Sequence, residues 1–450
     1  MGEILVEDSH LWGAQTQRSL QNFAIGTERI PREVIEALVI LKLAASRVNH
    51  SFGKLDEERA TLIGRACEEI LSGSYEEEFP LKVWQTGSGT QSNMNVNEVI
   101  SHLAVRDLAD PSAVKIHPND HVNLSQSSND TFPTALHVAA VRALTGSLLP
   151  ALREMTEVLR ELEAKEENIA AIKIGRTHLQ DAVPIRFSQE ISGWRGMLEE
   201  STKMVEAALP SLRKLAIGGT AVGTGLNAPE GFDAACAAEI SHLTGEQFVP
   251  AENKFYALTS KDACVFAHGA LKALAADLMK IANDIRWLAS GPRCGLGEIR
   301  IPENEPGSSI MPGKVNPTQC EALTMIAVQV MGNDAAIGFA ASQGNFELNV
   351  FMPVIAYNLF QSIRLLSDGM HSFVKNCLRG LKANPAAMRS YLDRSLMLVT
   401  ALTPVIGYEK AAAAAHKAHE EGLSLKEAVT AMGLMSEEEY DTYICPEKLV

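Results

Sequence analysis

The chain has 450 residues, of which 46% are hydrophobic and only 6% aromatic, and its formal net charge is −15. This length exceeds one ordinary domain and predicts two or three, with cores built mostly from aliphatic side chains. The acidic balance argues against nucleic acid as a partner, and an anionic ligand would need a locally positive pocket.

Seven cysteines are scattered along the chain and never form a C-x-x-C arrangement. Reduced, buried thiols in a cytoplasmic protein are therefore expected, and an iron–sulfur site is not. Residues 1–8 are acidic and lack a cationic, apolar leader, which favours the same location.

In chain order, the apolar periodicity predicts helices, several of them unusually long. Amphipathic helices are expected at 32–48 and 57–71, and a polar turn within 80–97 enters a helix that runs through Val105. Longer helices are expected at 135–164, after the polar loop 174–184 to about residue 215, at 257–288, at 319–342 and at 353–378. Helices of this length and breadth of apolar face predict a mainly α fold with a bundle shared between subunits.

Three domains are predicted from these patterns. A mixed, mostly helical N-terminal domain is expected at 1–130, a central long-helix bundle at 131–384 and a small helical C-terminal domain at 385–450. The stretch 322–341 is nearly uncharged but contains Asp334 and lacks cationic flanks. We expect other helices to bury it, and no membrane association is predicted.

The most informative stretch is residues 307–316, Gly-Ser-Ser-Ile-Met-Pro-Gly-Lys-Val-Asn. Its glycines and prolines predict a loop, and Asn316 and Pro317 suit the N-cap and first position of the helix that follows. A helix N-terminus favours a carboxylate or phosphate, and Lys314 adds a positive charge. We interpret the loop as an anion clamp whose two serines are placed for chemistry.

Two other polar segments have the same design. Ser127-Ser128-Asn129 and Thr177-His178 are each expected to end a loop just before a long helix. Ordinary capping explains any one such segment. If the helices bundle, however, the three N-termini converge and surround a small dianion, so their coincidence favours a binding site.

The sequence also carries a family resemblance. Residues 306–321, Pro-Gly-Ser-Ser-Ile-Met-Pro-Gly-Lys-Val-Asn-Pro-Thr-Gln-Cys-Glu, resemble the signature loop of the fumarase/aspartase superfamily. Gly313 and the Thr-Gln-Cys-Glu tail resemble class II fumarate hydratases, because aspartases usually carry alanine at that glycine and a different tail. The run Leu11–Ser19, Leu-Trp-Gly-Ala-Gln-Thr-Gln-Arg-Ser, resembles that family's N-terminal motif.

The resemblance implies a three-domain fold with a central helix bundle shared across a homotetramer. It implies active sites built from three subunits, a small dicarboxylate substrate and no cofactor. The substrate-binding residues that it implies are Ser88, Gly89, Thr90, Ser127, Ser128, Asn129, Thr177, Ser309, Lys314, Val315 and Asn316.

A second dicarboxylate site is implied at His117, Pro118, Asn119 and Asp120. A metal there would need ligands beyond His117, Asp120 and His121, so no metal is expected. The glycine-rich run 218–225 lacks a βαβ context, so nucleotide binding is not expected either.

The activity that the resemblance implies is the reversible hydration of fumarate to (S)-malate, a tricarboxylic acid cycle reaction. Loss of the weakly acidic C3 proton of malate places charge on the adjacent carboxylate, which donors must stabilise. From the residues alone, His178 is the natural base because histidine titrates near neutrality. The resemblance instead implies Ser308 as the base, with His178 and Glu321 handling the water or hydroxyl.

Two alternatives remain at this point. One is an aspartate ammonia-lyase or a related lyase on the same scaffold, against which Gly313 argues. The other is a helical scaffold that has lost catalysis, against which the intact set Ser308, Lys314, Asn316 and His178 argues.

Overall fold

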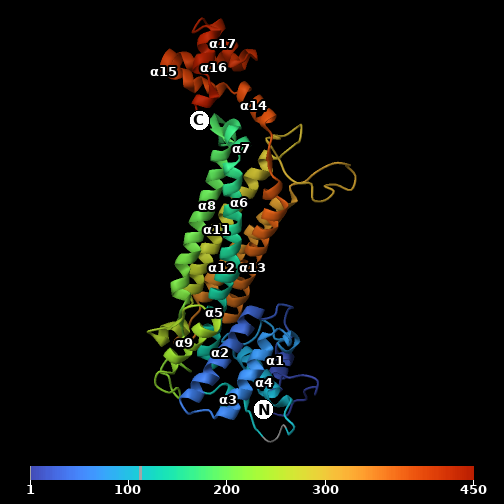
Figure 1. The fold of residues 1–450 in the computed structure, drawn as a ribbon, viewed down its shortest axis with the longest axis vertical. Helices are drawn as coiled ribbons and strands as arrows, with labels where there is room; N and C mark the ends of the chain where they lie inside the picture. The colour runs from blue at the N-terminus through green and yellow to red at the C-terminus, as the bar shows by residue number, and fades with distance from the viewer. Residues whose placement is uncertain (1, 111–113) are drawn as a thin grey trace. The chain divides into compact units, whose positions relative to one another are not determined.

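The computed structural model describes residues 2–110 and 114–450, and helices dominate it (Figure 1). The expectation of a mainly α fold is therefore confirmed. Within the described residues the strands form short pairs: β1 (Ile172–Thr177) with β2 (Gln180–Arg186), β3 (Lys214–Leu215) with β4 (Val249–Pro250), and β5 (Ile299–Arg300) with β6 (Lys382–Ala383). The β3–β4 pair is parallel and the others are antiparallel.

The helical elements follow one another along the whole described chain. The α-helices are α1 (Ala14–Asn22), α2 (Arg32–Ser51), α3 (Glu57–Leu71), α4 (Thr90–Arg106), α5 (Ser128–Ala143), α6 (Leu149–Ala164), α7 (Glu166–Ala170), α8 (Phe187–Leu212), α9 (Phe232–Thr244), α10 (Lys254–Thr259), α11 (Asp262–Leu288), α12 (Thr318–Ala341), α13 (Met352–Asn376), α14 (Pro385–Arg394), α15 (Thr403–Ile406), α16 (Tyr408–Glu421), α17 (Leu425–Ala431) and α18 (Glu437–Tyr443). Short 3₁₀ or π turns are η1 (Glu76–Glu78), η2 (Pro118–Val122), η3 (Leu144–Leu148), η4 (Leu378–Gly380), η5 (Leu396–Leu402) and η6 (Pro446–Lys448).

Most predicted helices are present with small shifts at their ends. The helix expected at 57–71 is α3, whose N-cap Asp56 accepts a hydrogen bond from the Arg59 N–H. The helix expected at 135–164 begins earlier, at Ser128, and a π turn interrupts it at Leu144–Leu148. The polar residues 128 and 129, expected in the preceding loop, lie in its first turn, and Ser127 and Asp130 cap it.

The chain divides into two compact units. The first comprises Met1–Pro150, Ser201–Ala275 and Ala327–Ser367, and the second comprises Ala151–Glu200, Ala276–Ile326 and Asp368–Val450. The long helices α8, α11, α12 and α13 each contribute residues to both units. The domain boundaries at residues 130 and 384 stay predictions.

Helix α2 lies at the centre of the first unit's core, where it packs against α3, α5 and α9. Its sequence is apolar on nearly every side, so neighbouring helices must surround it. Val34, Leu38 and Leu41 are fully buried, and so is the cation Lys42. In the same unit, α11, α12 and α13 are joined through His268, which bonds Asp334 and Ser362.

The second unit contains the β1–β2 hairpin and the C-terminal helices. Ile172 and Ile174 of β1 pack with Leu392 of α14 and with residues of η5 and α16 in one apolar cluster. The Trp194 indole of α8 donates to the Asp284 carboxylate of α11 across 3.0 Å, which ties these helices together.

Two helical stretches, Ser128–Ala164 and Thr318–Ala341, are long and apolar enough to cross a membrane by length and composition. Core helices pass the same test, and 61% of the apolar window of the first is buried. Only 28% of the corresponding window of Thr318–Ala341 is buried, which leaves most of its apolar surface uncovered in the single chain.

Candidate active site

The turn at residues 88–90 begins α4 in the first unit. Gly89 adopts φ +74°, and a Cβ at this position would lie 2.1 Å from the Phe132 ring. Gly87 is equally constrained, because a Cβ there would lie 1.3 Å from the Val350 carbonyl oxygen. The Ser88 and Thr90 hydroxyls are hydrogen-bonded at 2.7 Å, so the turn presents a pair of coupled hydroxyl groups.

Ser127 is the N-cap of α5, and Ser128 and Asn129 lie in its first turn, ahead of the expected start at residue 135. Ser127 and Asp130 form a reciprocal capping box. The Asn93 amide of α4 donates to the Ser128 hydroxyl across 3.1 Å. The structure therefore brings the segments 88–90 and 127–129 together at the N-terminal ends of two adjoining helices.

Asp130 anchors this arrangement to the glycine-rich segment 218–225. Its carboxylate accepts hydrogen bonds from the backbone N–H groups of Gly218 and Thr220, at 3.1 and 2.8 Å. Burial raises the pKa of Asp130 to about 6, and the backbone donors oppose that rise. The Asn129 amide donates to the Ala221 carbonyl oxygen at 2.8 Å. The glycine-rich run thus supports the α5 N-terminus.

Sequence reasoning missed a buried cation close to these segments. The Lys42 ammonium donates to Asn123 Oδ1 at 2.8 Å and to Gln126 Oε1 at 2.9 Å. Asn123 Oδ1 also accepts from the Asn93 amide at 3.1 Å. Burial lowers the pKa of Lys42 to about 7, and the charge of Asp130 offsets part of this effect. A lone lysine inside the apolar run 38–45 was the available signal.

The second predicted dicarboxylate site, residues 117–120, lies at the π turn η2. His117 Nδ1 accepts from the backbone N–H groups of Asn119 and Asp120, at 3.3 and 3.1 Å. Its ring also lies 3.2 Å from the Asp120 carboxylate. Across the part of the chain that is described, no group of three or more His, Cys, Asp or Glu side chains is arranged to hold a metal ion.

The prediction that Thr177 and His178 end a loop just before a long helix is wrong. They do not precede a helix: Thr177 ends β1, and His178 and Leu179 form the two-residue turn to β2. Both turn residues have positive φ, +56° and +60°, as a type I′ hairpin turn requires. Each such non-glycine residue costs about 1–2 kcal/mol, and such strain concentrates at functional sites. The cause of the error is that this turn lacks the usual Asn-Gly signal.

The loop 307–316 in the second unit closes on itself. The Gly307 N–H donates to the Lys314 carbonyl oxygen at 2.9 Å, and the Asn316 amide donates to the Gly307 carbonyl oxygen at 2.6 Å. Helix α12 begins at Thr318, so the prediction that Asn316 is the N-cap is wrong. Its side chain stabilises the loop instead, because the Gly307 carbonyl oxygen lies within its reach.

Ser308 has a distinctive environment within that loop. Its Oγ accepts hydrogen bonds from the backbone N–H groups of Ile310 and Met311, at 3.3 and 3.2 Å. N–H groups aimed at an oxygen stabilise negative charge on it. Ser308 is half-buried, whereas Ser309, Lys314 and Val315 are exposed.

The remaining candidates of the second unit are not joined to one another. Throughout residues 2–110 and 114–450, the side chains of His178, Lys314 and Glu321 make no hydrogen bond or ion pair. Each of these side chains is exposed. The single chain thus presents charged and titratable groups that are free to meet a ligand or another copy of the chain.

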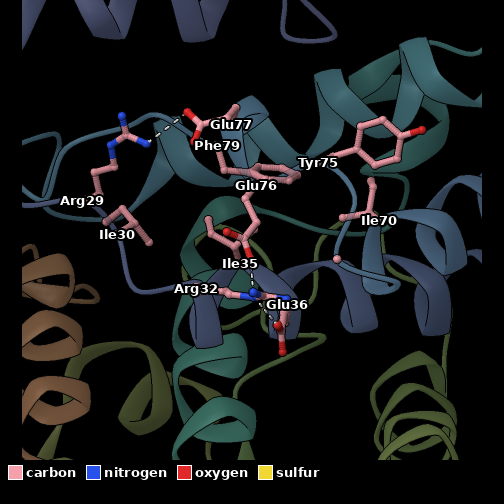
Figure 2. Close-up of a pocket in the computed structure, with 11 residues that line it drawn as sticks. Arg29, Ile30, Arg32, Ile35, Glu36, Ile70, Tyr75, Glu76, Glu77 and Phe79 are labelled. Atoms are coloured by element: carbon pink, nitrogen blue, oxygen red, sulfur yellow. Dashed lines mark hydrogen bonds and ion pairs between the residues drawn. The ribbon is translucent and has the colours of Figure 1, made fainter. Parts of the chain in front are cut away.

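A cavity of about 180 Å³ in the first unit lies away from all of these residues. Apolar side chains such as Ile35, Ile70 and Phe79 line it. Figure 2 shows the charged residues of its rim paired with one another, Arg29 with Glu77 and Arg32 with Glu36. Because these rim charges are paired, they offer the cavity no free acid, base or anion-binding group.

Comparison with known proteins identifies the family. A family model described as Lyase matches residues 2–332, and one described as Fumarase C C-terminus matches residues 398–450. Proteins named fumarate hydratase class II from Helicobacter pylori and Bacillus cereus are 59% and 60% identical, covering 100% of this chain and 97% of each relative.

Solved structures agree with this assignment. A crystal structure of class II fumarase from Schistosoma mansoni has a TM-score of 0.95 and 42% identity, covering 99% of this chain and 96% of that one. A fumarate lyase:delta crystallin from Brucella melitensis, bound to cobalt, has a TM-score of 0.92 and 38% identity, covering 98% and 96%. The chain therefore belongs to the class II fumarate hydratase family of lyases.

Proposed function

We propose that the protein is a hydro-lyase that catalyses the reversible hydration of fumarate to (S)-malate. The observation that carries this proposal is the identity of about 60%, over the full length, to proteins named fumarate hydratase class II. The tail Thr318–Glu321 and Gly313 favour the same activity over that of an ammonia-lyase.

The proposed reaction, in the direction of dehydration, has two proton transfers. Ser308 Oγ takes the C3 proton of malate, and negative charge develops on the adjacent carboxylate. The electron pair then forms the C2=C3 double bond as the C2–O bond breaks. His178, with Glu321, gives a proton to the departing hydroxide, so that water leaves.

The role of Ser308 as base is supported by its surroundings. Two backbone N–H groups point at its oxygen, and they favour the negatively charged form of the hydroxyl over the neutral one. Lys314 belongs to the same closed loop, and its ammonium has no partner among the described residues. Both features support a site that stabilises developing negative charge.

The substrate-binding role is assigned to the two turns of the first unit and to the rest of the signature loop. Coupled hydroxyls at 88–90 and the helix N-termini at 127–129 offer donors suited to carboxylates. Lys314 and Asn316 would contribute a charge and an amide. The residues 117–120 are proposed as a second dicarboxylate site.

The active site is proposed to form only in a homotetramer, from residues of several subunits. Support comes from the apolar surface of α12, where Met325, Val328 and Phe339 are 67%, 62% and 76% exposed. Such surfaces on long helices mark contacts with other chains. The unpartnered side chains of His178, Lys314 and Glu321 are consistent with a site that another subunit completes.

A cytoplasmic location is proposed as well. The seven cysteines are all free thiols in the structure, including Cys236 and Cys264 of the first unit. Reduced thiols are typical of cytoplasmic proteins.

An absorbance assay tests the function. Purified protein is given malate and, separately, aspartate, and the ultraviolet absorbance of fumarate is followed. We expect fumarate from malate and none from aspartate. Turnover of aspartate alone would overturn the proposal in favour of an ammonia-lyase, and size-exclusion chromatography with light scattering checks the tetramer.

A further inference from the structure

A buried ion network in the second unit links the β1–β2 hairpin to the strand that leads to the signature loop. Glu298, which has no exposed surface, accepts two hydrogen bonds from the Arg176 guanidinium, at 3.0 and 2.9 Å. The Lys173 ammonium lies 3.1 Å from Glu298 and 2.7 Å from Glu190. Two cations and two carboxylates therefore balance one another in a largely buried cluster.

The hairpin that carries Lys173 and Arg176 contains a β-bulge. Residues 173 and 176 are an odd number of positions apart, so a regular strand would point their side chains to opposite faces. The β1–β2 register shifts between Ile174 and Arg176: Gly175 of β1 lies opposite two residues of β2, Ala182 and Val183, so the extra residue belongs to β2. A Cβ on Gly175 would lie 2.9 Å from the Val183 carbonyl oxygen, so glycine suits the bulge. Despite this odd spacing, Lys173 and Arg176 both reach the Glu298 carboxylate, at 3.1 and 2.9 Å.

The network lies directly before the strained turn that carries His178. Leu179, the other turn residue, is 71% exposed, so little of this chain packs against the tip of the hairpin. Strained backbone persists only where its surroundings hold it. The constraint on the His178 turn therefore comes from the base of the hairpin, where Arg176 is the nearest residue with buried, directional contacts.

Glu298 is itself fixed to rigid structure on its other side. Its carbonyl oxygen accepts from the Asn384 N–H at 2.8 Å, and the Asn384 side chain donates to the Gly297 carbonyl oxygen at 2.8 Å. Strand β5 follows immediately and leads toward the loop 307–316. The Arg176 guanidinium also lies 5.7 Å from the centre of the Tyr391 ring of α14.

We propose that Arg176 and Glu298 are positioning residues that hold the His178 turn in register with the strand preceding the signature loop. This inference rests on the proposed function, since it concerns how His178 is presented for proton transfer. Their proposed role is positioning and not contact with the substrate, because the Arg176 guanidinium is engaged by the fully buried Glu298. The bidentate geometry matters because two parallel bonds fix both the distance and the angle between the segments, which a lysine's single ammonium cannot do.

The test is a set of kinetic measurements on the full-length protein. Arg176→Lys keeps the charge but loses the paired hydrogen bonds, and the matched control Arg389→Lys alters an exposed guanidinium that pairs with Asp393 on α14. We expect Arg176→Lys to lower kcat by about 10- to 100-fold, with KM for malate changed less than about twofold, because small misplacements of a reacting group cost this much. For the control variant, kcat and KM should both stay within about twofold of the wild-type values.

A double-mutant cycle separates positioning from general destabilisation. If Arg176 acts through His178, Arg176→Lys should cost less than about threefold in a His178→Asn background, whereas independent effects would multiply. Three outcomes would each overturn the inference. In the first, Arg176→Lys lowers kcat by the same factor in the wild-type and His178→Asn backgrounds. In the others, it leaves kcat unchanged or changes only KM. If Arg176→Lys does not fold, Tyr391→Leu provides a milder perturbation, expected to lower kcat several-fold at constant KM; an unchanged kcat there would also overturn it. A wild type without malate turnover would instead refute the proposed function.

Discussion

The two units bury lysines in different ways, and the difference separates their tasks. Lys42 of the first unit is held by the amide oxygens of Asn123 and Gln126, with burial lowering its pKa to about 7. Lys173 of the second unit is equally buried but is paired with the carboxylates of Glu190 and Glu298.

The comparison shows that the partner, and not burial alone, decides what a buried cation does. Lys42 has amide oxygens and no carboxylate as hydrogen-bond acceptors, so its protonated form places positive charge near the 127–129 turn, where the proposed substrate is a dianion, and Asp130 offsets part of the effect of burial. A cation between carboxylates cancels their charge and fixes strands in place. Lys42 thus adds positive charge near the proposed binding turns of the first unit, and Lys173 helps to fix the hairpin that carries His178 in the second.

The largest expected effect lies in the second unit. Ser308→Ala should lower kcat about 10³-fold and leave KM for malate and the assembly unchanged, because a general base contributes about 10²–10⁴ in rate. Steady-state kinetics and light scattering measure both quantities. If Ser308→Ala raises KM and spares kcat, Ser308 serves binding and not the chemical step, and its proposed role as base is wrong.

The next largest effect is expected from Lys173, the lysine paired with carboxylates. Lys173→Met removes the cation between Glu190 and Glu298 and leaves buried carboxylate charge without one of its partners. We expect the free energy of unfolding to fall by about 3–5 kcal/mol, as for other broken buried pairs. Urea titration at fixed protein concentration measures it, with the exposed Lys54→Met as control. A loss below about 1 kcal/mol would mean that the pair matters little.

A smaller, pH-dependent effect is expected from the lysine among amides. Above pH 7 the folded protein holds Lys42 neutral, whereas the unfolded chain keeps it protonated up to the ordinary value of 10.5. The unfolded state then binds more protons, so stability relative to Lys42→Met should rise by about 1.4 kcal/mol per pH unit between pH 7 and 10.5. Below pH 7 the difference should be flat. Urea titrations from pH 6 to 9 test this, and a constant difference throughout would contradict the lowered pKa.

The smallest effect tests the first unit's binding role. Ser88→Ala removes one of two coupled hydroxyls, and we expect KM for malate to rise about three- to tenfold with little change in kcat. The loss corresponds to one ordinary hydrogen bond of about 0.5–1.5 kcal/mol. A fall in kcat at constant KM would assign Ser88 to the chemical step instead.

Much of the fold could be predicted because its helices are long and strongly periodic. Residues 57–71 form a helix as predicted, since an aspartate N-cap and a regular apolar face mark its extent. The α5 N-terminus is predicted too late, at residue 135, although Ser127 and Asp130 form a capping box that marks its true start.

What escaped prediction depends on distant contacts. The hairpin 172–186 looked like a loop, because its turn uses His178 and Leu179 in a conformation that other sequences reach with glycine or asparagine. Lys42 could not be recognised as part of the site, since its partners Asn123 and Gln126 lie 81 and 84 positions away. The Arg176–Glu298 pair spans 122 positions and has no local signature.

The contact between Gly87 and Val350 has a consequence for anyone redesigning this enzyme. Two segments separated by most of the chain touch there with no room for a single methyl group. A variant library of the turn at residues 88–90 should therefore keep glycine at position 87. In variants altered near residue 350, we expect changes in substrate selectivity. The exposed residues Val350 and Phe351 therefore contact or adjoin the turn from a segment that is distant in the sequence.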